Sequence, residues 1–207
     1  MSIALFGEVM PLDAMPKSRN IRGVGLSDWV GYAERLAERL DYTNTFYHQE
    51  PRLDITAVPE VLLGRLDFVI SSDVFEHVTR PVERAFDGAR SLLKPGGVLI
   101  LTVPYALEFD HTLEHFPELH DWSLVDQGEG RFELHDRRPD GIVHRYDQLI
   151  FHGGPGMTLE FRVFSKTSLL KELERAGFSD IRIASEPLLA WGIYWPCTWS
   201  LPIVARA

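Results

Sequence analysis

The sequence predicts an α/β domain in which a mostly parallel β-sheet is covered by helices on both faces. Apolar, β-branched segments typical of buried strands alternate along the chain with segments whose apolar residues recur at helical spacing. The 207 residues suffice for one well-buried domain of this class and are marginal for two. We therefore expect a single domain, residues 1–207.

Periodicity and flanking residues locate the elements. Residues 27–40 predict a helix, with Ser27 or Asp28 placed to cap its first turn. Further helices are predicted over residues 81–93, before the terminating sequence KPGG, and over residues 165–177. The segments predicted as strands are TNTFYH (43–48), LDFVISS (66–72), GVLILTVP (97–104), SDIRIAS (179–185) and WSLPIVARA (199–207).

Residues 105–162 interrupt this alternation with polar sequence rich in His, Asp, Glu and Gly. Polar–apolar alternation on both sides of Pro139-Asp140-Gly141 predicts a β-hairpin within this insertion. Ligands of parallel α/β sheets bind beyond the carboxyl ends of the strands. The residues that follow each predicted strand are therefore the candidates for a site.

Composition excludes several classes of function. The net charge of −9 and the sequence pI of about 5.3 disfavour non-specific binding to nucleic acid or anionic lipid. A single cysteine, Cys197, rules out an internal disulfide and a multi-cysteine metal site, and fits a reducing compartment. The chain shows no signal peptide, and no run approaches the ~20 apolar residues of a membrane span. We expect a cytoplasmic protein with neither a nucleic-acid nor a membrane partner.

Three stretches of the sequence carry a family resemblance. These are LDFVISSDVFEHVTRPVERAFDGARSLLKPGGVLILTVP (66–104), FSKTSLLKELERAGFSDIRIAS (164–185) and the closing WSLPIVARA. Together they resemble the later strands and helices of the class I S-adenosylmethionine-dependent methyltransferase family. The resemblance implies a Rossmann-like fold with a mostly parallel seven-stranded sheet, helices on both faces and an antiparallel last strand. It also implies S-adenosyl-L-methionine as the cofactor.

The glycine-rich turn of this family matches IRGVGLSD here. Gly23 and Gly25 are kept, but Leu26 and Ser27 stand where further small residues are usual. A glycine turn that feeds a helix N-terminus presents free backbone N–H groups, which suit a carboxylate. The resemblance therefore assigns Gly23, Gly25 and Ser27 to the methionine portion of the cofactor. A tight turn that binds no ligand is the alternative.

The remaining cofactor contacts match less evenly. The family's second strand ends in an acid that binds the ribose hydroxyls, and here TNTFYHQEP offers Asn44, Glu50 or neither. Asp54 and Ile55 match the pair that ends the third strand, beside the adenine. The stretch between these strands is too short for the usual helix. Either this chain binds the cofactor with a reduced set of contacts, or it has lost the cofactor site.

The loop SSDVFEHV follows the fourth strand, where the family lines its cofactor and acceptor pockets. The resemblance places Asp73 and Val74 against the methionine portion. Glu76 and His77 are expected to hold the loop in shape.

The residues after the fifth strand are expected to cover the acceptor, with 105–162 as a lid. We predict that Tyr105, His111 and His115 orient an acceptor or take its proton, since histidine titrates near neutrality. Surface histidines in a hairpin are the structural alternative. HTLEH also matches the H-x-x-E-H pattern of inverted zinc peptidases, in which two imidazoles on one helix face bind zinc. Nothing else resembles that class, and no metal is expected.

The sequence thus predicts a methyltransferase acting on a small-molecule, sugar-related acceptor. Methyl transfer is an in-line displacement on an activated sulfonium, so the protein supplies proximity, alignment and proton removal. The alternative is a catalytically inactive methyltransferase-like module used for binding or assembly.

Overall fold

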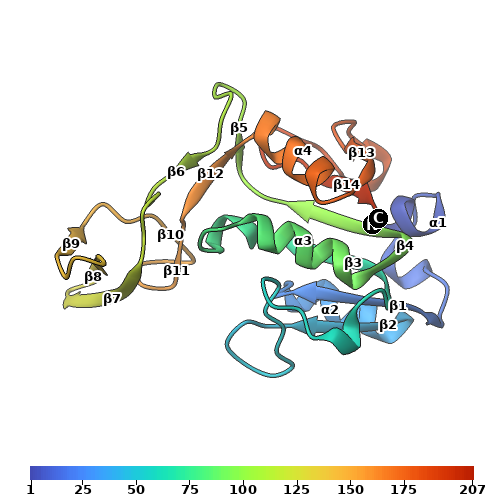
Figure 1. Ribbon diagram of the computed structural model, residues 1–207. Coiled ribbons are helices and arrows are strands. Elements are labelled where there is room, and N and C mark those ends of the chain that lie inside the picture. Colours follow the sequence, from blue (N-terminus) through green and yellow to red (C-terminus); the bar gives the residue numbers. More distant parts are fainter.

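The computed structural model describes residues 1–207 and is built on one six-stranded sheet with helices on both faces (Figure 1). Its strands are β1 (Ser18–Leu26), β2 (Leu40–Thr45), β3 (Leu66–Ser72), β4 (Leu93–Thr102), β13 (Ser179–Ile183) and β14 (Ile203–Arg206). The helices are α1 (Ser2–Phe6), α2 (Val30–Arg39), α3 (Glu83–Leu92) and α4 (Lys166–Arg175), with 3-10 turns η1 (Leu12–Ala14), η2 (Glu60–Leu62), η3 (Phe75–His77) and η4 (Leu189–Trp191). None of the helices combines the length and the apolar character needed to cross a membrane.

The strand order is β13-β14-β4-β3-β1-β2. Strands β1 to β4 pair in parallel, whereas β14 pairs antiparallel with both β4 and β13. The chain runs from β1 to β2 on one side and then to β3 on the other, so the order reverses between β1 and β3. Such a reversal opens a crevice beyond the carboxyl ends of the strands. The predicted fold class and its antiparallel last strand are confirmed.

The connection from β2 to β3 differs from the predicted seven-stranded sheet. The segment that ends at Asp54 and Ile55, which the resemblance matches to the end of the third strand, contributes only a parallel bridge between Phe46 and Arg52. Directly afterwards the Oδ1 atom of Asp54 accepts a hydrogen bond from the N–H of Thr56 and closes a turn. This turn ends the extended conformation, so the sheet has six strands.

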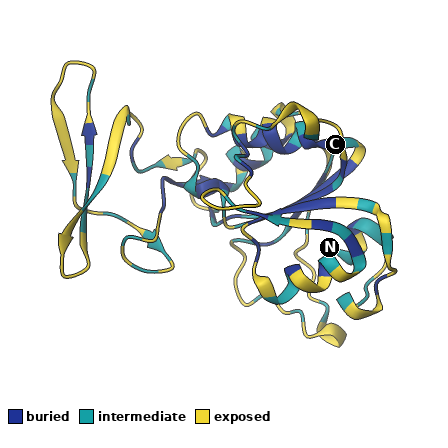
Figure 2. Ribbon diagram, turned by 90° about the horizontal axis from the view of Figure 1, so that it is seen from below, coloured by how far each residue is buried: buried dark blue, intermediate teal, exposed yellow.

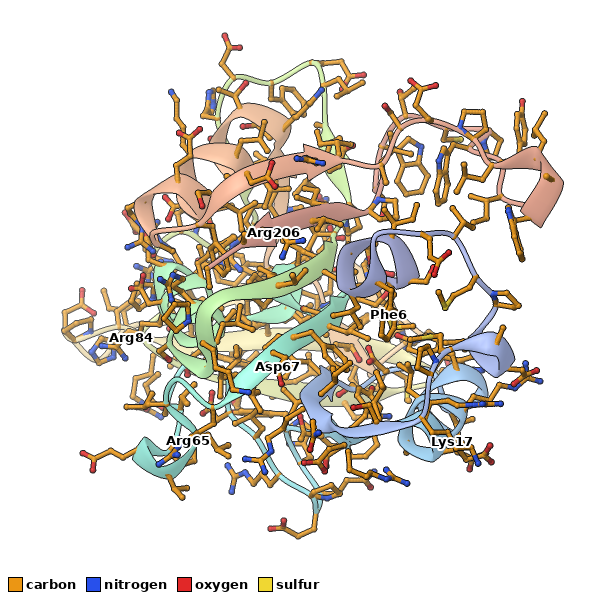
Figure 3. The ribbon with its side chains drawn as sticks, turned by 90° about the vertical axis from the view of Figure 1, so that its right-hand side faces the viewer. Phe6, Lys17, Arg65, Asp67, Arg84 and Arg206 are labelled. Carbon is orange, nitrogen blue, oxygen red and sulfur yellow. The ribbon has the colours of Figure 1, made fainter.

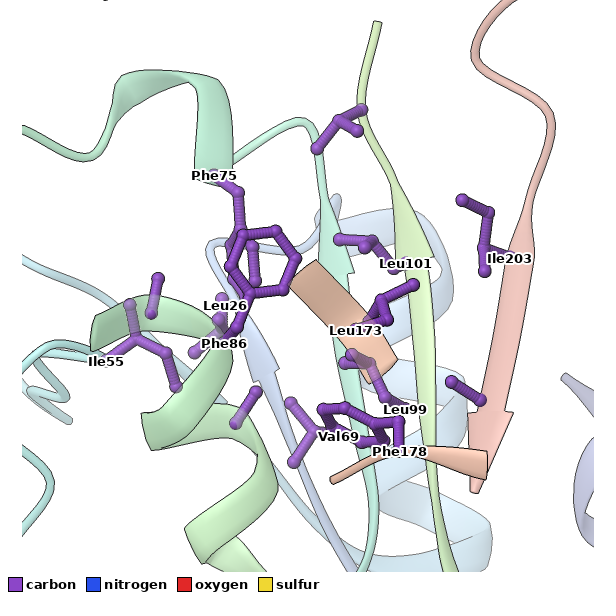
Figure 4. Packing of buried hydrophobic residues seen from close by; sticks show 14 of the residues in the cluster. Leu26, Ile55, Val69, Phe75, Phe86, Leu99, Leu101, Leu173, Phe178 and Ile203 are labelled. Atoms are coloured by element: carbon purple, nitrogen blue, oxygen red, sulfur yellow. The ribbon is translucent and has the colours of Figure 1, made fainter. Parts of the chain in front are cut away.

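The sheet separates two hydrophobic clusters because alternate residues of a strand point to opposite faces. Leu99 of β4 belongs to the larger cluster, with Phe86 of α3 and Leu173 of α4 (Figure 4). Its neighbour Ile100 faces the other cluster, which contains Leu36 of α2. The apolar stripes predicted from helical spacing are therefore the buried faces of these helices.

Polar contacts close the edge of the sheet opposite to the carboxyl ends of the parallel strands (Figure 3). Arg206 donates to the carbonyl oxygen of Ala4 in α1 at 3.2 Å. Asp67, at the start of β3, pairs with Lys94 and accepts the backbone N–H of Arg22, each at 2.8 Å. Both chain termini lie on this side (Figure 1), so neither covers the crevice.

The predicted insertion forms small sheets that extend away from the main one (Figure 1). Its strands are β5 (Tyr105–Ala106), β6 (Leu113–Glu114), β7 (Asp121–Gly128), β8 (Arg131–Arg137), β9 (Val143–Tyr146), β10 (Phe151–His152), β11 (Thr158–Leu159) and β12 (Arg162–Ser165). The hairpin is confirmed: β8 and β9 flank a turn in which Gly141 has a φ of 84° and donates to the carbonyl of Arg138. Most of the β7-β8-β9 sheet is exposed (Figure 2).

The packing of residues 53–56 on α3 can be tested at a helical glycine. A Cβ at Gly88 would overlap the backbone carbonyl oxygen of Ile55. We expect Gly88→Ala to lower the free energy of unfolding by about 1–3 kcal/mol, despite the better helix propensity of Ala. Urea denaturation measures this change.

The matched control is Gly31→Ala in α2. There the added Cβ meets only the exposed ring of Trp29, which can move aside. The control should keep its stability or gain up to about 1 kcal/mol. A Gly88→Ala protein as stable as the wild type would contradict the close packing.

Candidate functional site

The candidate site lies at the carboxyl ends of β1, β2 and β3, where the strand order reverses. The strand register places Gly25 beside Asn44 of β2 and Ile70 of β3. The turns that follow these strands therefore share one edge of the sheet. Ser27 and Asp73 in these turns have left-handed φ values of 58° and 53°, which bend the chain sharply after β1 and β3.

A buried carboxylate fills the turn between β1 and α2. Asp28 is 5% exposed, and its Oδ2 atom accepts a hydrogen bond from the Tyr42 hydroxyl at 2.5 Å. Its Oδ1 atom makes no hydrogen bond within the chain; burial raises the pKa of this carboxyl, while the nearby hydroxyls of Tyr42 and Tyr32 act against the shift. Gly25 leaves the room required, because a Cβ there would overlap Asp28 and Tyr42. The predicted cap is wrong: Trp29 is the N-cap residue of α2, and no side chain, of Ser27 or Asp28, bonds the first turn.

Asn44 is engaged by the backbone of this same turn. Its Oδ1 accepts the N–H of Asp28 and its Nδ2 donates to the carbonyl of Asp28, both at 2.8 Å. The amide is therefore not free to bind ribose hydroxyls. Glu50, the other residue considered, is exposed and accepts the N–H of Arg52 at 2.9 Å. The structure supplies no acid at the end of β2.

Asp54 is half-buried in the turn that follows the Phe46–Arg52 bridge. Its Oδ1 accepts hydrogen bonds from the N–H and the hydroxyl of Thr56, at 2.9 and 2.7 Å. Its Oδ2 makes no hydrogen bond within the chain.

Three residues predicted to contact the cofactor pack into the protein instead. Gly23 lies within β1, where its missing Cβ admits the ring of Phe68. The side chain of Ile55 is buried in the larger hydrophobic cluster, and Val74 packs against the same cluster. The structure therefore supports a packing role for these three positions.

Asp73 lies between two groups of polar side chains at this edge. One group contains Asp28 and Tyr32, and the other contains Glu76. Asp73 is exposed, and its N–H donates to the carbonyl of Thr102 at 2.9 Å. On one side, burial and then the carboxylates of Asp28 and Asp73 raise the pKa of Tyr32. On the other side, burial raises the pKa of Glu76 to about 8, and the charge of Asp73 adds to this shift.

The second group is a histidine–carboxylate cluster, made of Glu76, His77, His115, His152 and Glu160. His77 bonds the carbonyl of Leu159 through Nδ1 at 2.8 Å, and its Nε2 lies 3.0 Å from Nδ1 of His152. The Glu160 carboxylate bonds His152 at 2.9 Å and His115 at 2.8 Å. Glu76 is 0% exposed, and neither of its oxygens has a hydrogen-bond partner. Burial lowers the pKa of His77.

Sequence reasoning found only part of this cluster. Glu76 and His77 were expected to shape the loop after β3, and they do form η3 there. His152 lies 75 residues further along the chain and meets His77 only because the insertion folds back. In the sequence, neither His152 nor Glu160 stands out from the other polar residues of 105–162.

The residues predicted to handle an acceptor have different surroundings. Tyr105 is 3% exposed within the larger hydrophobic cluster, and burial raises the pKa of its hydroxyl. The structure therefore does not support a catalytic role for Tyr105. His111 is exposed and makes no hydrogen bond within the chain, whereas His115 belongs to the histidine–carboxylate cluster.

The HTLEH segment does not form the helix that a zinc peptidase would need. Leu113–Glu114 is strand β6, and Glu114 pairs with the buried guanidinium of Arg162 at 2.8 and 3.2 Å. Arg162 also donates to the carbonyl oxygens of Phe75 and Val78 at the two ends of η3. Glu114 thus serves as the counterion of Arg162.

A hollow of about 610 Å³ lies within the insertion rather than at this edge. Polar side chains of Gln127, Arg131, Glu133 and Asp147 dominate its lining. None of the predicted site residues borders it.

Solved structures of similar fold are methyltransferases. An S-adenosylmethionine-dependent methyltransferase from Mesorhizobium loti is 18% identical, with a TM-score of 0.52 over 95% of this chain and 95% of that chain. One from Clostridium acetobutylicum is 12% identical, with a TM-score of 0.52 over 90% and 84%. The CurJ carbon methyltransferase is 20% identical, with a TM-score of 0.54 over 95% of this chain, which spans 50% of the CurJ chain.

The fold is thus that of class I S-adenosylmethionine-dependent methyltransferases. The profile of the methyltransferase domain family matches residues 8–183, and the chain belongs to this family. No curated protein sequence matches it significantly. Family and fold together confirm the predicted enzyme class and its cofactor, S-adenosyl-L-methionine.

The dependence of the site on Arg162 can be tested by substitution. Arg162→Met keeps the apolar stem but leaves Glu114 and two carbonyl groups without their donor. We expect the free energy of unfolding to fall by about 3–5 kcal/mol, as for other broken buried ion pairs. In the control Arg182→Met, an exposed pair with Asp180 is lost, and the change should stay within about 0.5 kcal/mol. Similar urea midpoints for Arg162→Met and Arg182→Met would refute the structural role assigned to Arg162.

Proposed function

We propose that the chain transfers the methyl group of S-adenosylmethionine to a small, sugar-related acceptor at the carboxyl ends of β1 and β3. The observation that carries this proposal is that two carboxylates lie at that edge, in the turns that follow β1 and β3. Asp28 presents a buried oxygen without a partner, and Asp73 presents an exposed carboxylate in the adjacent turn.

These residues fit the charges of the cofactor. S-adenosylmethionine carries an ammonium, a sulfonium and a carboxylate, and when bound it supplies an activated methyl group. The free oxygen of Asp28 suits the ammonium, and the unbonded N–H groups in the first turn of α2, beside Ser27, suit the carboxylate. Asp73 favours the positive sulfonium by charge. Asp54, with one oxygen free, retains its proposed place beside the adenine.

A small acceptor with a hydroxyl or amino group fits this edge better than a polyanion. Asp28, Asp73 and Glu160 contribute to its acidic character, and the net charge of −9 acts in the same sense. A structure of similar fold is the sugar N-methyltransferase KedS8 from Streptoalloteichus, 14% identical with a TM-score of 0.51 over 90% of this chain and 80% of that chain. We assign residues 105–162 as the cover of the acceptor, with His111 and His115 on that side.

The acceptor class is tested by incubating the protein with S-adenosylmethionine and separate panels of sugars and amino sugars, phenols and short RNA. Mass spectrometry should show a sugar product heavier by one methylene unit. Methylation of RNA or of phenols alone would refute the sugar assignment. Failure to bind S-adenosylhomocysteine would instead favour a catalytically inactive module.

The role of Asp28 is tested by Asp28→Asn, which preserves shape and removes the charge. A hydrogen bond to a charged group contributes about 1.5–3 kcal/mol, so S-adenosylhomocysteine should bind about 10- to 100-fold more weakly. Calorimetric titration measures this change. Asp41→Asn, at the far end of β2 where Asp41 pairs with Arg22, is the control and should bind as the wild type does. Equal affinities of Asp28→Asn and wild type would remove Asp28 from the site.

A further inference from the structure

Three ligand-type atoms in the histidine–carboxylate cluster converge on one point. Nε2 of His77 and Nδ1 of His152 are 3.0 Å apart, and Oε1 of Glu76 lies 3.7 Å from each. Atoms at these separations leave a central point about 2 Å from all three, which is the length of a zinc–nitrogen or zinc–oxygen bond. We propose that Glu76, His77 and His152 bind a divalent transition-metal ion of the zinc class, contrary to the expectation from the sequence.

Each imidazole uses the nitrogen that faces away from the other ring to donate a hydrogen bond. The two nitrogens that face each other, Nε2 of His77 and Nδ1 of His152, therefore carry no proton. Nδ1 of His77 faces the carbonyl of Leu159, which can only accept, so this nitrogen carries the proton. Nε2 of His152 likewise donates to the carboxylate of Glu160. Two neutral rings then present lone pairs to each other across 3.0 Å, and either a metal ion or a proton between them removes the repulsion.

Glu76 is a second, independent indication of a cation. Its side chain is completely buried, points at the two imidazoles, and has no hydrogen-bond donor for either oxygen. A buried carboxylate without a partner is strongly unfavourable. A metal ion at the central point removes this cost and the repulsion between the two nitrogens together.

The surrounding contacts are those of a metal centre. Metal-binding histidines donate their other ring N–H to a carboxylate or a backbone carbonyl, which fixes the tautomer and the ring orientation. His152 and His77 each have such a partner, in Glu160 and in the carbonyl of Leu159. Glu160 is itself held by His115.

The ligand set defines the class of metal and its role. Two imidazoles with one carboxylate suit zinc and its transition-metal neighbours, whereas magnesium and calcium prefer oxygen ligands. Three protein ligands leave a fourth position for water or another oxygen ligand. Because η3 supplies two ligands and β10 supplies the third, the ion joins the insertion to the main domain. The proposal does not depend on the identity of the methyl acceptor.

The test uses the untagged full-length protein, stripped with a chelator and titrated with Zn²⁺ and then with Co²⁺. We expect one equivalent of Zn²⁺ by calorimetry, a visible Co²⁺ absorption band, and a zinc-dependent rise in melting temperature. His152→Ala should abolish all three. His144→Ala, an exposed histidine on the same insertion, is the matched control and should behave as the wild type does.

A second variant keeps the test valid if His152→Ala is poorly folded. Glu160→Gln leaves the three ligands in place and removes only the carboxylate behind His152, so zinc should bind about 10- to 100-fold more weakly. Circular dichroism verifies the fold of each variant. No binding of zinc by the wild type, or equal binding by wild type and His152→Ala, would overturn the proposal and leave a shared proton between the imidazoles.

Discussion

The buried guanidinium of Arg162 is the interaction on which the polar part of the structure depends. It pairs with Glu114 of β6 and bonds the carbonyl oxygens of Phe75 and Val78 on either side of η3. A buried cation that loses such partners is strongly destabilising, so these groups are held together. The insertion and the loop after β3 are thereby fixed against each other, and the position of Glu76 and His77 follows from this contact.

On the opposite side of the site, a different set of contacts holds the turn after β1. With no full third strand beside β2, the turn after β1 is fixed from within by Tyr42, Asn44 and Asp28. These side chains fill the space above Gly25 and leave a single carboxylate oxygen free. The turn after β1 is therefore well defined although the sheet lacks a full third strand beside β2.

Local periodicity was enough to predict most of the regular structure. Helices α2 and α3, strands β3 and β4, and the hairpin around Gly141 depend on neighbouring residues, and the structure confirms them. The third strand fails because Asp54 closes a local turn onto Thr56, whereas the cap of α2 fails because Asp28 has a partner elsewhere in the chain. Asp28 bonds Tyr42 instead of the first turn of α2, and the histidine–carboxylate cluster depends on long-range contacts such as that between His77 and His152, 75 residues apart. No local pattern encodes such contacts.

The way in which the insertion is attached has an evolutionary consequence. The chain leaves the main domain through β5 and β6 and returns through β12, and both outgoing strands pair with the returning one. The insertion therefore rests on one narrow stem. Residues can be gained or lost near its tip without shifting the register of the six-stranded sheet, since exposed connections tolerate such changes. This part of the chain can diversify rapidly among relatives while the sheet and its edge stay the same.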